Sequence, residues 1–394
     1  STLRDDRHRV YRSHRHSMLL KSIEDVGATL AWCPTSSSSE TLLALGTKEV
    51  SGSGFDDYGA SLELHSLDDE SLKDKKPLAK GRSSARFASL TWSWHRSEAL
   101  PMGLIAGGMS DGSVDVWDPA KLAAGHPKAL VSKVQRHSGA VNGLEFNPHA
   151  SSAHLVASGG ADGEVFVVAL DSPEKPNVFV PAAPPSSTSS SSNGKGVGGE
   201  ITTVAWNTQV SHILATASTN GTCVVWDLRQ KRPWCELRDA GRENVADVCW
   251  NPSEGLHIAT CSGDDSAVVR LWDLRSSTTM PLGTLRGHEQ GILSASWCRD
   301  DTSLLATCAR DNKTFVWDLF SMTKVYELPD VGGGADGGGL VSSDGTLSGG
   351  VARGGASSAL SSSSSSSFGG GASLQLGGGA ASTEAFFGGG GGGG

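Results

Sequence analysis

The sequence predicts an all-β fold built from repeated small antiparallel sheets, and three observations lead to this prediction. An apolar, strand-like run ending in an aromatic residue recurs six times, at Trp32, Trp92, Phe146, Trp206, Trp250 and Trp297. A second strand-like run follows each of these, and four of the six second runs end in Trp-Asp. Tight-turn signals such as Ser110-Asp-Gly and Thr219-Asn-Gly lie between strands, where residues tolerant of positive φ close hairpins.

Four short strands per unit with a Trp-Asp ending are the pattern of WD40 repeats, whose units form the blades of a β-propeller. A single blade cannot bury both of its faces, so blades pack side by side around a central channel. The sequence therefore predicts a WD40 β-propeller over residues 18–330, with six recognisable blades of a seven-bladed plan. The blades are expected near residues 28–78, 86–131, 140–180, 200–238, 244–285 and 291–329.

Three segments of biased composition flank or interrupt this repeat. Residues 1–17 carry five arginines and are expected to form a basic disordered extension. Residues 172–199 are rich in Pro, Ser and Gly and are expected to form a disordered loop, because such residues bury too little apolar area to offset the entropy of ordering. Residues 331–394 are nearly all Gly, Ser and Ala and are expected to be a disordered tail.

Charge and composition exclude several classes of function. The 394-residue chain has a formal net charge of -9, and residues 1–17 contribute +3 from five Arg against Asp5 and Asp6, which leaves -12 for the rest. An acidic body argues against a nucleic acid as the main partner. No apolar run reaches the ~18 residues of a membrane span, and no signal peptide is recognisable. The seven cysteines form no C-x-x-C pair, so we expect buried reduced thiols and no metal site.

Polar residues that recur in the blades have a structural explanation. WD40 blades often join a loop His, a strand Ser or Thr, a turn Asp and the Trp of Trp-Asp by hydrogen bonds, because an unpaired buried polar group costs roughly 1–3 kcal/mol. The sixth unit has all four residues, and the third unit has three of them but carries Val168 in place of Trp. The residues assigned to these blade networks are His288, Thr307, Asp311, Trp317, His137, Ser158, Asp162, Asp111, Trp117, Trp226 and Trp272.

Catalytic motifs are missing from the sequence. We find no G-x-S-x-G, P-loop, H-E-x-x-H or dinucleotide fingerprint, and the paired carboxylates Asp264 and Asp265 fall in a blade turn that the repeat already explains. We therefore expect no catalytic residue, no metal ligand and no cofactor. A non-enzymatic role is the prediction.

Several stretches depart from a generic WD40 chain and resemble one family. They are a Trp-Asp followed by Pro-x-Lys-φ-x-x-Gly at 117–125, an Asn-x-Gln-Val-x-His-Ile-Leu run within 200–218, a lengthened turn before 271–275, and the segments 291–297 and 325–329. Over about residues 18–329 the chain is similar to the N-terminal propeller of the large WD40-bearing subunit of the COPII outer coat. The residues that carry this similarity most specifically are Pro119, Lys121, Gly125, Asn207, Gln209 and His212.

The resemblance implies a structural scaffold of the COPII coat, active in vesicle budding and protein transport from the endoplasmic reticulum to the Golgi. It implies partners among the other outer-coat subunits and self-association at cage vertices. It also implies a cytoplasmic location, with indirect membrane association on the cytosolic face of endoplasmic reticulum exit sites and COPII vesicles. The alternative is a generic WD40 interaction scaffold, such as a ubiquitin-ligase substrate receptor.

The same resemblance marks what this sequence lacks. In the family a seventh blade follows the sixth, and further parts contact the smaller propeller subunit and the inner coat. Here Gly and Ser follow Pro329, so those contacts are not expected of this chain. Residues 19–24 resemble the strand that completes the seventh blade in the family. We therefore expect a wedge-shaped opening between the first and sixth blades.

Overall fold

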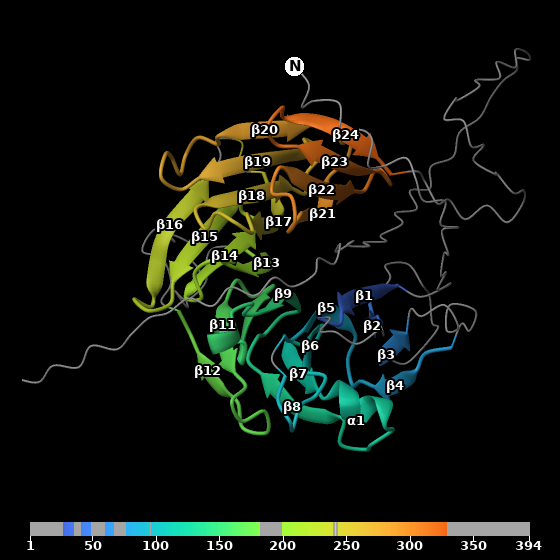
Figure 1. Cartoon of the computed structure of the whole chain (residues 1–394). Helices are drawn as coiled ribbons and strands as arrows, with labels where there is room; N and C mark the ends of the chain where they lie inside the picture. The colour runs from blue at the N-terminus through green and yellow to red at the C-terminus, as the bar shows by residue number, and fades with distance from the viewer. Residues whose placement is uncertain are drawn as a thin grey trace, which may run out of the picture.

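The computed structural model describes residues 27–34, 41–48, 60–66, 76–94, 96–181, 199–238, 241 and 243–328. Within these ranges the protein is a series of six four-stranded antiparallel sheets arranged around a common centre, in the order of the sequence (Figure 1). The WD40 β-propeller predicted from the sequence, with six blades, is confirmed. The terminal segments 1–17 and 331–394, and the expected strand at 19–24, lie outside the described residues.

Each blade is a meander in which consecutive strands pair. The first blade comprises β1 (Ala28–Trp32), β2 (Leu42–Thr47), β3 (Ser61–Ser66) and β4 (Ala79–Arg82). The second comprises β5 (Phe87–Trp92), β6 (Ile105–Met109), β7 (Ser113–Trp117) and β8 (Leu130–Gln135). The third comprises β9 (Val141–Phe146), β10 (Leu155–Gly160), β11 (Val165–Ala169) and β12 (Asn177–Phe179).

The last three blades follow the same plan. The fourth comprises β13 (Ile201–Trp206), β14 (Ile213–Ser218), β15 (Thr222–Asp227) and β16 (Arg232–Arg238). The fifth comprises β17 (Val245–Trp250), β18 (His257–Ser262), β19 (Val268–Asp273) and β20 (Gly283–Arg286). The sixth comprises β21 (Ile292–Trp297), β22 (Leu304–Ala309), β23 (Thr314–Asp318) and β24 (Thr323–Glu327).

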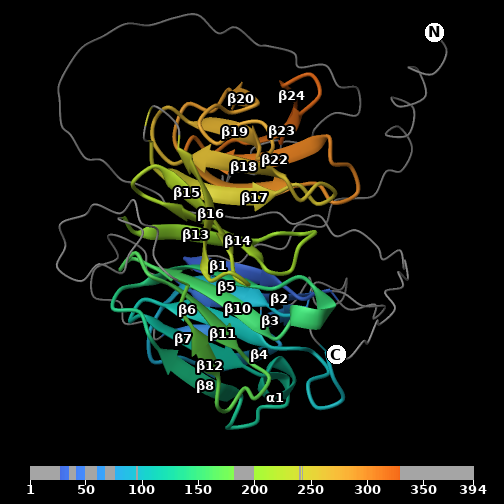
Figure 2. The same ribbon diagram turned by 90° about the vertical axis from the view of Figure 1, so that its left-hand side faces the viewer.

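Two short helical segments interrupt the strands. The helix α1 (Pro119–Ala123) follows β7, and a 3-10 turn, η3 (Ala150–Ser152), follows β9. Helix α1 lies beside β4 of the first blade (Figure 2), because Leu122 packs at Gly81. The helix thus covers the junction of the first two blades.

The core consists of five apolar clusters, one at each junction between consecutive blades. Strands in the middle of a blade are packed on both faces, so β6 and β7 are buried along their whole length. The aromatic that ends an inner strand supplies much of the packing, as Trp206 and Trp250 do in neighbouring clusters. Blade-to-blade burial of these side chains is the main source of stability.

The sixth blade is buried on one face only. Along β22 the residues Leu305, Thr307 and Ala309 are buried and their alternating neighbours are half-exposed, whereas Ile258–Ser262 of β18 are all buried. The inner strands of each consecutive pair of blades pack together, and within the described residues no comparable packing joins β21 to β1. The first and sixth blades therefore stand at the two ends of an open arc (Figure 1), which agrees with the expected opening.

Three boundary predictions are wrong. The expected disordered loop 172–199 overlaps the third blade, because Asn177–Phe179 form β12 on β11, and only 182–198 lie outside the described residues. The expected end of the first blade, residue 78, precedes β4, and the expected end of the second, residue 131, falls inside β8. These outer strands consist mostly of exposed and half-buried residues, so they lack the apolar runs that mark inner strands.

Candidate functional site: the blade networks and surfaces of the propeller

The complete four-residue network lies in the sixth blade. The Trp317 indole donates to Thr307 Oγ1 at 2.8 Å, and Thr307 lies 2.8 Å from His288 Nε2. His288 Nδ1 lies 3.1 Å from Asp311 Oδ2, which also accepts the Glu289 N–H. Burial lowers the pKa of His288, so a neutral ring that accepts from Thr307 and donates to Asp311 fits the chain of contacts. The arrangement is enclosed and holds the loop before β21 onto the turn after β22.

The third blade has a shorter version of the same network. His137 lies 3.0 Å from both Asp162 Oδ1 and Ser158 Oγ. Val168 occupies the position of the tryptophan, and the Phe166 ring packs edge-to-face with the histidine instead, with centroids 4.6 Å apart. The network ends at the serine.

The remaining network residues are not all brought together. Trp226 and Trp272 donate to Thr216 and Thr260 at 2.9 Å. In the second blade Gly107 replaces the threonine, so the buried Trp117 Nε1 has no hydrogen-bond partner.

The turn aspartate of that second blade serves a different contact. Asp111 accepts a hydrogen bond from Ser113 Oγ and pairs with Lys133 at 2.8 Å. Burial opposes the ionised form of Asp111, but the bonds from Lys133 and Ser113 outweigh it and lower the pKa of the carboxyl. Asp111 is therefore an ion-pair partner on the surface of its blade.

The Pro-x-Lys segment forms the start of α1. Asp118 caps the helix by accepting from the N–H groups of Ala120 and Lys121, and Pro119 occupies the first turn, where its missing N–H has no cost. Lys121 returns to Asp118 at 3.1 Å. Gly125 adopts φ +67°, a left-handed conformation that glycine accepts without strain. The segment thus forms a short capped helix that packs against the first blade.

The Asn-x-Gln-Val-x-His run ties the fourth blade to the fifth. Asn207 Oδ1 accepts from the N–H groups of Gln209 and Val210, and its Nδ2 donates to Gly255 O at 2.7 Å. Gln209 reaches Pro252 O at 2.5 Å. His212 is half-buried, and burial together with the Arg229 charge lowers its pKa. These residues position loops between blades.

Two inner-strand carboxylates make the contacts between blades that sequence reasoning missed. Glu145 on β9 accepts the Trp206 N–H at 2.6 Å, and Asp247 on β17 accepts the Ala295 N–H at 2.8 Å. Burial raises the pKa of Glu145 to about 7 and raises that of Asp247 as well. Each carboxylate therefore binds the backbone of the next blade's inner strand. An acidic residue within the first strand of a blade, as in β9 and β17, is the signal that could have identified them.

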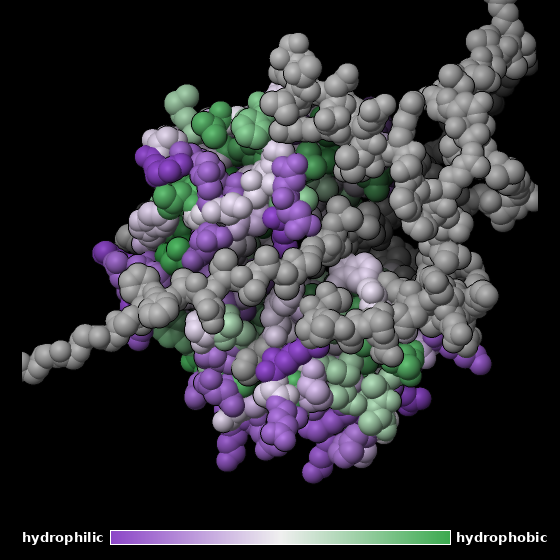
Figure 3. Space-filling view, viewed as in Figure 1, coloured by the Kyte–Doolittle hydropathy of each residue, from purple (hydrophilic) through white to green (hydrophobic). Residues whose placement is uncertain are grey.

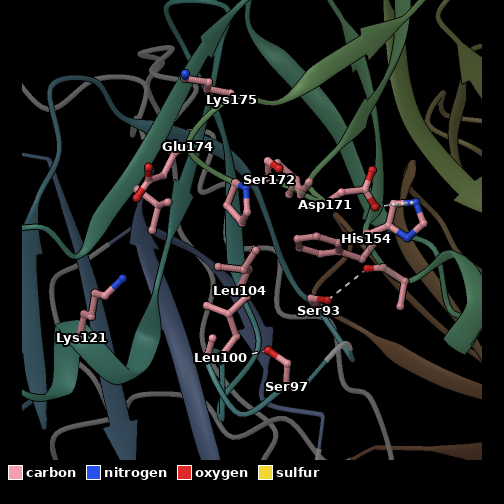
Figure 4. A pocket seen from close by; sticks show the side chains of 16 residues that line it. Ser93, Ser97, Leu100, Leu104, Lys121, His154, Asp171, Ser172, Glu174 and Lys175 are labelled. Atoms are coloured by element: carbon pink, nitrogen blue, oxygen red, sulfur yellow. Dashed lines mark hydrogen bonds and ion pairs between the residues drawn. The ribbon is translucent and has the colours of Figure 1, made fainter.

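A cavity of about 750 Å³ lies between the second and third blades, on the side of α1 (Figure 4). Leu100, Leu104, Phe146 and Leu170 supply apolar lining, and charged side chains ring it. Lys121 Nζ lies 3.1 Å from the carboxylate of the helix-capping Asp118, and His154 Nε2 lies 3.3 Å from Asp171 Oδ1. The cavity therefore has an apolar lining with polar side chains around it, several of which already contact one another.

The described residues contain no group of three or more His, Cys, Asp or Glu side chains arranged to hold a metal ion. Among them, no helix is both long and apolar enough to cross a membrane. The seven cysteines are unpaired thiols, with Cys223 and Cys261 buried and the others half-buried. Burial raises the pKa of Cys235 to about 11, so this thiol stays protonated near neutrality.

Comparison with known proteins identifies relatives of this propeller. The chain is 37% identical to the protein transport protein SEC31 of Mycosarcoma maydis in an alignment 335 residues long, and the match covers 77% of this chain and 22% of that protein. It is 36% identical to SEC31 of Dictyostelium discoideum, with the same coverage. The homologues of this propeller are SEC31 proteins. The chain spans about a fifth of the length of these SEC31 relatives.

Solved structures agree with the SEC31 homology. A chain from the outer coat vertex of COPII on membranes matches with a TM-score of 0.63 and 28% identity, covering 77% of this chain and 76% of that one. A chain from the COPII coat assembled on membranes matches with the same score and identity, covering 42% of that chain. A family model described as Nucleolar protein 10-like, N-terminal domain, matches residues 122–316. That stretch is WD40 blades, a pattern that propellers of many functions share.

Proposed function

We propose that this SEC31-like propeller is a non-enzymatic structural element of the COPII outer coat. It acts in vesicle budding and transport from the endoplasmic reticulum to the Golgi, through contacts between coat subunits at cage vertices. The observation that carries the proposal is the match to the outer coat vertex structure, which covers 76% of that chain at 28% identity. The enclosed networks around His288 and His137 support a scaffold, because their polar atoms are used in holding loops.

The partners are other outer-coat subunits, including other copies of the same propeller. Membrane association is indirect, through the coat, on the cytosolic face of endoplasmic reticulum exit sites. The alternative of a ubiquitin-ligase substrate receptor has no match among the relatives named above.

Localisation of the tagged chain tests the proposal. Punctate signal that coincides with endoplasmic reticulum exit sites is the expected result. Accumulation in the nucleolus would overturn it and would favour the function of the Nucleolar protein 10-like family instead. A uniform signal in cells whose own SEC31 remains at exit sites would also count against it.

A further inference from the structure

The outer edge of the fourth blade carries exposed basic residues and an exposed tryptophan. Arg229, Lys231 and Arg232 are all exposed, and Trp234 is 50% exposed. We call these four residues the basic edge. They lie in the turn between β15 and β16 and at the start of β16, the outermost strand of its sheet. Hydrophilic residues are visible at the left-hand edge of the molecule (Figure 3), where β16 lies in Figure 1.

The fifth blade provides an internal comparison for the first of these arginines. Both blades have the sequence Trp-Asp-Leu-Arg, at 226–229 and at 272–275. Arg275 Nε lies 3.0 Å from Asp273 Oδ1, and Arg275 Nη2 lies 3.7 Å from Glu254 Oε2. In the fifth blade two carboxylates therefore compensate the charge of the arginine.

The fourth blade lacks the second of these carboxylates. The Ile213 N–H donates to Val210 O, as the His257 N–H donates to Glu254 O in the same loop of the fifth blade. Val210 therefore occupies the position of Glu254 and offers no carboxylate. Among the described residues Arg229 forms no ion pair. The two blades share a motif, but only the fourth leaves its arginine uncompensated.

The other two cations of the basic edge are uncompensated as well. Arg232 Nε donates to the amide oxygen of Gln230 at 2.7 Å, and Lys231 Nζ lies 5.2 Å from the centroid of the Phe179 ring. Both of these partners are neutral. The one carboxylate of the turn, Asp227, accepts backbone N–H groups. Three cations against one carboxylate leave +2 over residues 227–232, so this turn is basic on an acidic chain.

A β-bulge sets Trp234 apart from the regular strand. Val225 pairs with Cys235, and Trp226 pairs with Pro233. Trp234 is therefore the extra residue of the bulge. Pro233 has no N–H to offer to a further strand, and bulges and prolines are the devices that protect sheet edges from strand addition. A partner of the basic edge therefore has to bind through side chains.

We propose that the basic edge binds an acidic peptide segment in which carboxylates alternate with aromatic or leucine residues. Arginine pairs with a carboxylate through two parallel N–H···O bonds, and Arg and Trp are enriched among the residues that dominate binding energy at protein interfaces. Arg229 and Arg232 contact the carboxylates, and Trp234 packs against the apolar residue. This binding is additional to the coat contacts of the proposed function.

An anionic membrane is the poorer occupant of the same surface. Recognition of anionic lipids from the sequence rests on clusters of roughly four to eight Lys or Arg. The basic edge has three, on a chain with a formal net charge of -9. Charge therefore favours a short peptide, which contacts the basic edge without bringing the acidic remainder of the chain close to a negative surface.

Fluorescence anisotropy with the whole chain tests the proposal. The probe is a labelled peptide of repeated Glu-Asp-Phe-Glu-Asp-Leu units in 50 mM NaCl. We expect a Kd of tens of micromolar, raised at least tenfold by the double substitution Arg229→Glu and Arg232→Glu and at least threefold by Trp234→Ala. The matched control is Arg286→Glu, because Arg286 is exposed on the outer strand of the fifth blade, and it should change the Kd less than twofold. Thermal unfolding checks that each variant is folded. A wild type that does not bind at 500 µM, or an equal loss with Arg286→Glu, overturns the proposal.

Two further probes identify the occupant. A peptide with Ser in place of Phe and Leu should bind the wild type at least threefold more weakly and the Trp234→Ala variant no differently from the parent peptide. Equal binding of both peptides to the wild type would contradict the role of Trp234. Vesicles with 30% phosphatidylserine should not sediment with the protein. Sedimentation that the double arginine variant abolishes, without peptide binding, would assign the surface to a membrane instead. These probes need no coat assembly, so their results are independent of the localisation test of the proposed function.

Discussion

The guanidinium of Arg299 lies over the ring of Trp94, with 5.3 Å between the guanidinium carbon and the ring centroid. Arg299 follows the inner strand of the sixth blade and Trp94 follows that of the second. The pair thus joins two blades that are not consecutive in the chain. Such a link helps hold the sixth blade in place, because this blade has no following blade to pack against among the described residues.

Removal of this pair should show coupling between the two residues. A cation over an aromatic face contributes about 0.5–1 kcal/mol at a partly exposed site. We therefore expect a double-mutant cycle of Trp94→Ala and Arg299→Ala to give a coupling energy of about this size in denaturant unfolding. Effects of the two single substitutions that simply add would show that the contact contributes nothing.

The hydroxyl of Thr307 should be among the most sensitive polar groups of the fold. Thr307→Val removes the acceptor of the Trp317 indole and the partner of His288, and leaves both buried. At roughly 1–3 kcal/mol for each of these two buried unpaired groups, we expect a loss of about 2–6 kcal/mol in the free energy of unfolding.

Thr216→Val is the matched comparison. Thr216 accepts the Trp226 indole but has no histidine partner, so its loss should be about half as large. Urea titration of both variants provides the measurement. Equal losses in the free energy of unfolding would mean that the contact between Thr307 and His288 does not contribute to stability.

The division into blades could be predicted from the sequence, because each repeat contains the residues that form its own strands and turns. The aromatic at the end of each inner strand and the Asp-Gly or Asn-Gly turns give six blades, and the structure has strands ending at Trp92, Phe146 and Trp206 as expected. The third blade's shortened network was also readable, since Val168 cannot replace an indole donor.

Contacts that join distant parts of the chain could not be predicted from the repeat pattern. Trp94 and Arg299 are far apart in sequence, and neither belongs to the repeat pattern. Trp117 looked like a network residue, but the loss of its acceptor depends on Gly107, which the strand pairing places opposite Asp115. The strand β12 lies where composition favoured a loop, because tertiary pairing with β11 supplies what local propensity lacks.

Asn207 should contribute more to stability than its neighbour Gln209. Asn207→Ala removes an Asx turn and the bond to Gly255 O, and Asn207 is buried, so we expect a loss of about 1–3 kcal/mol. Gln209→Ala removes one exposed bond to Pro252 O and should cost less than about 1 kcal/mol. Thermal unfolding of both variants measures the difference. A larger effect at Gln209 would contradict the assignment of Asn207 as the tie between blades.

Glu145 should make stability fall as pH rises through neutrality. Burial, with a smaller contribution from the nearby Asp247 charge, raises the pKa of Glu145 to about 7 despite the lowering effects of the Trp206 N–H and Arg299. A carboxyl with a raised pKa binds its proton more tightly in the folded state than in the unfolded chain. Its favourable contribution is therefore fully present below the unfolded pKa of about 4.5 and is lost as pH rises through about 7.

Glu145→Gln removes this dependence and keeps an oxygen that accepts the Trp206 N–H. Relative to the wild type, the stability of the variant should rise by on the order of 1–3 kcal/mol between about pH 5 and about pH 8, a range that allows for the half-buried position of the side chain. Urea unfolding at several pH values measures the difference, and subtraction of the wild-type curve cancels the titration of all other groups. The exposed Glu174→Gln is the control and should follow the wild type. A constant difference between Glu145→Gln and the wild type over this range would show that Glu145 ionises as freely in the folded propeller as in the unfolded chain.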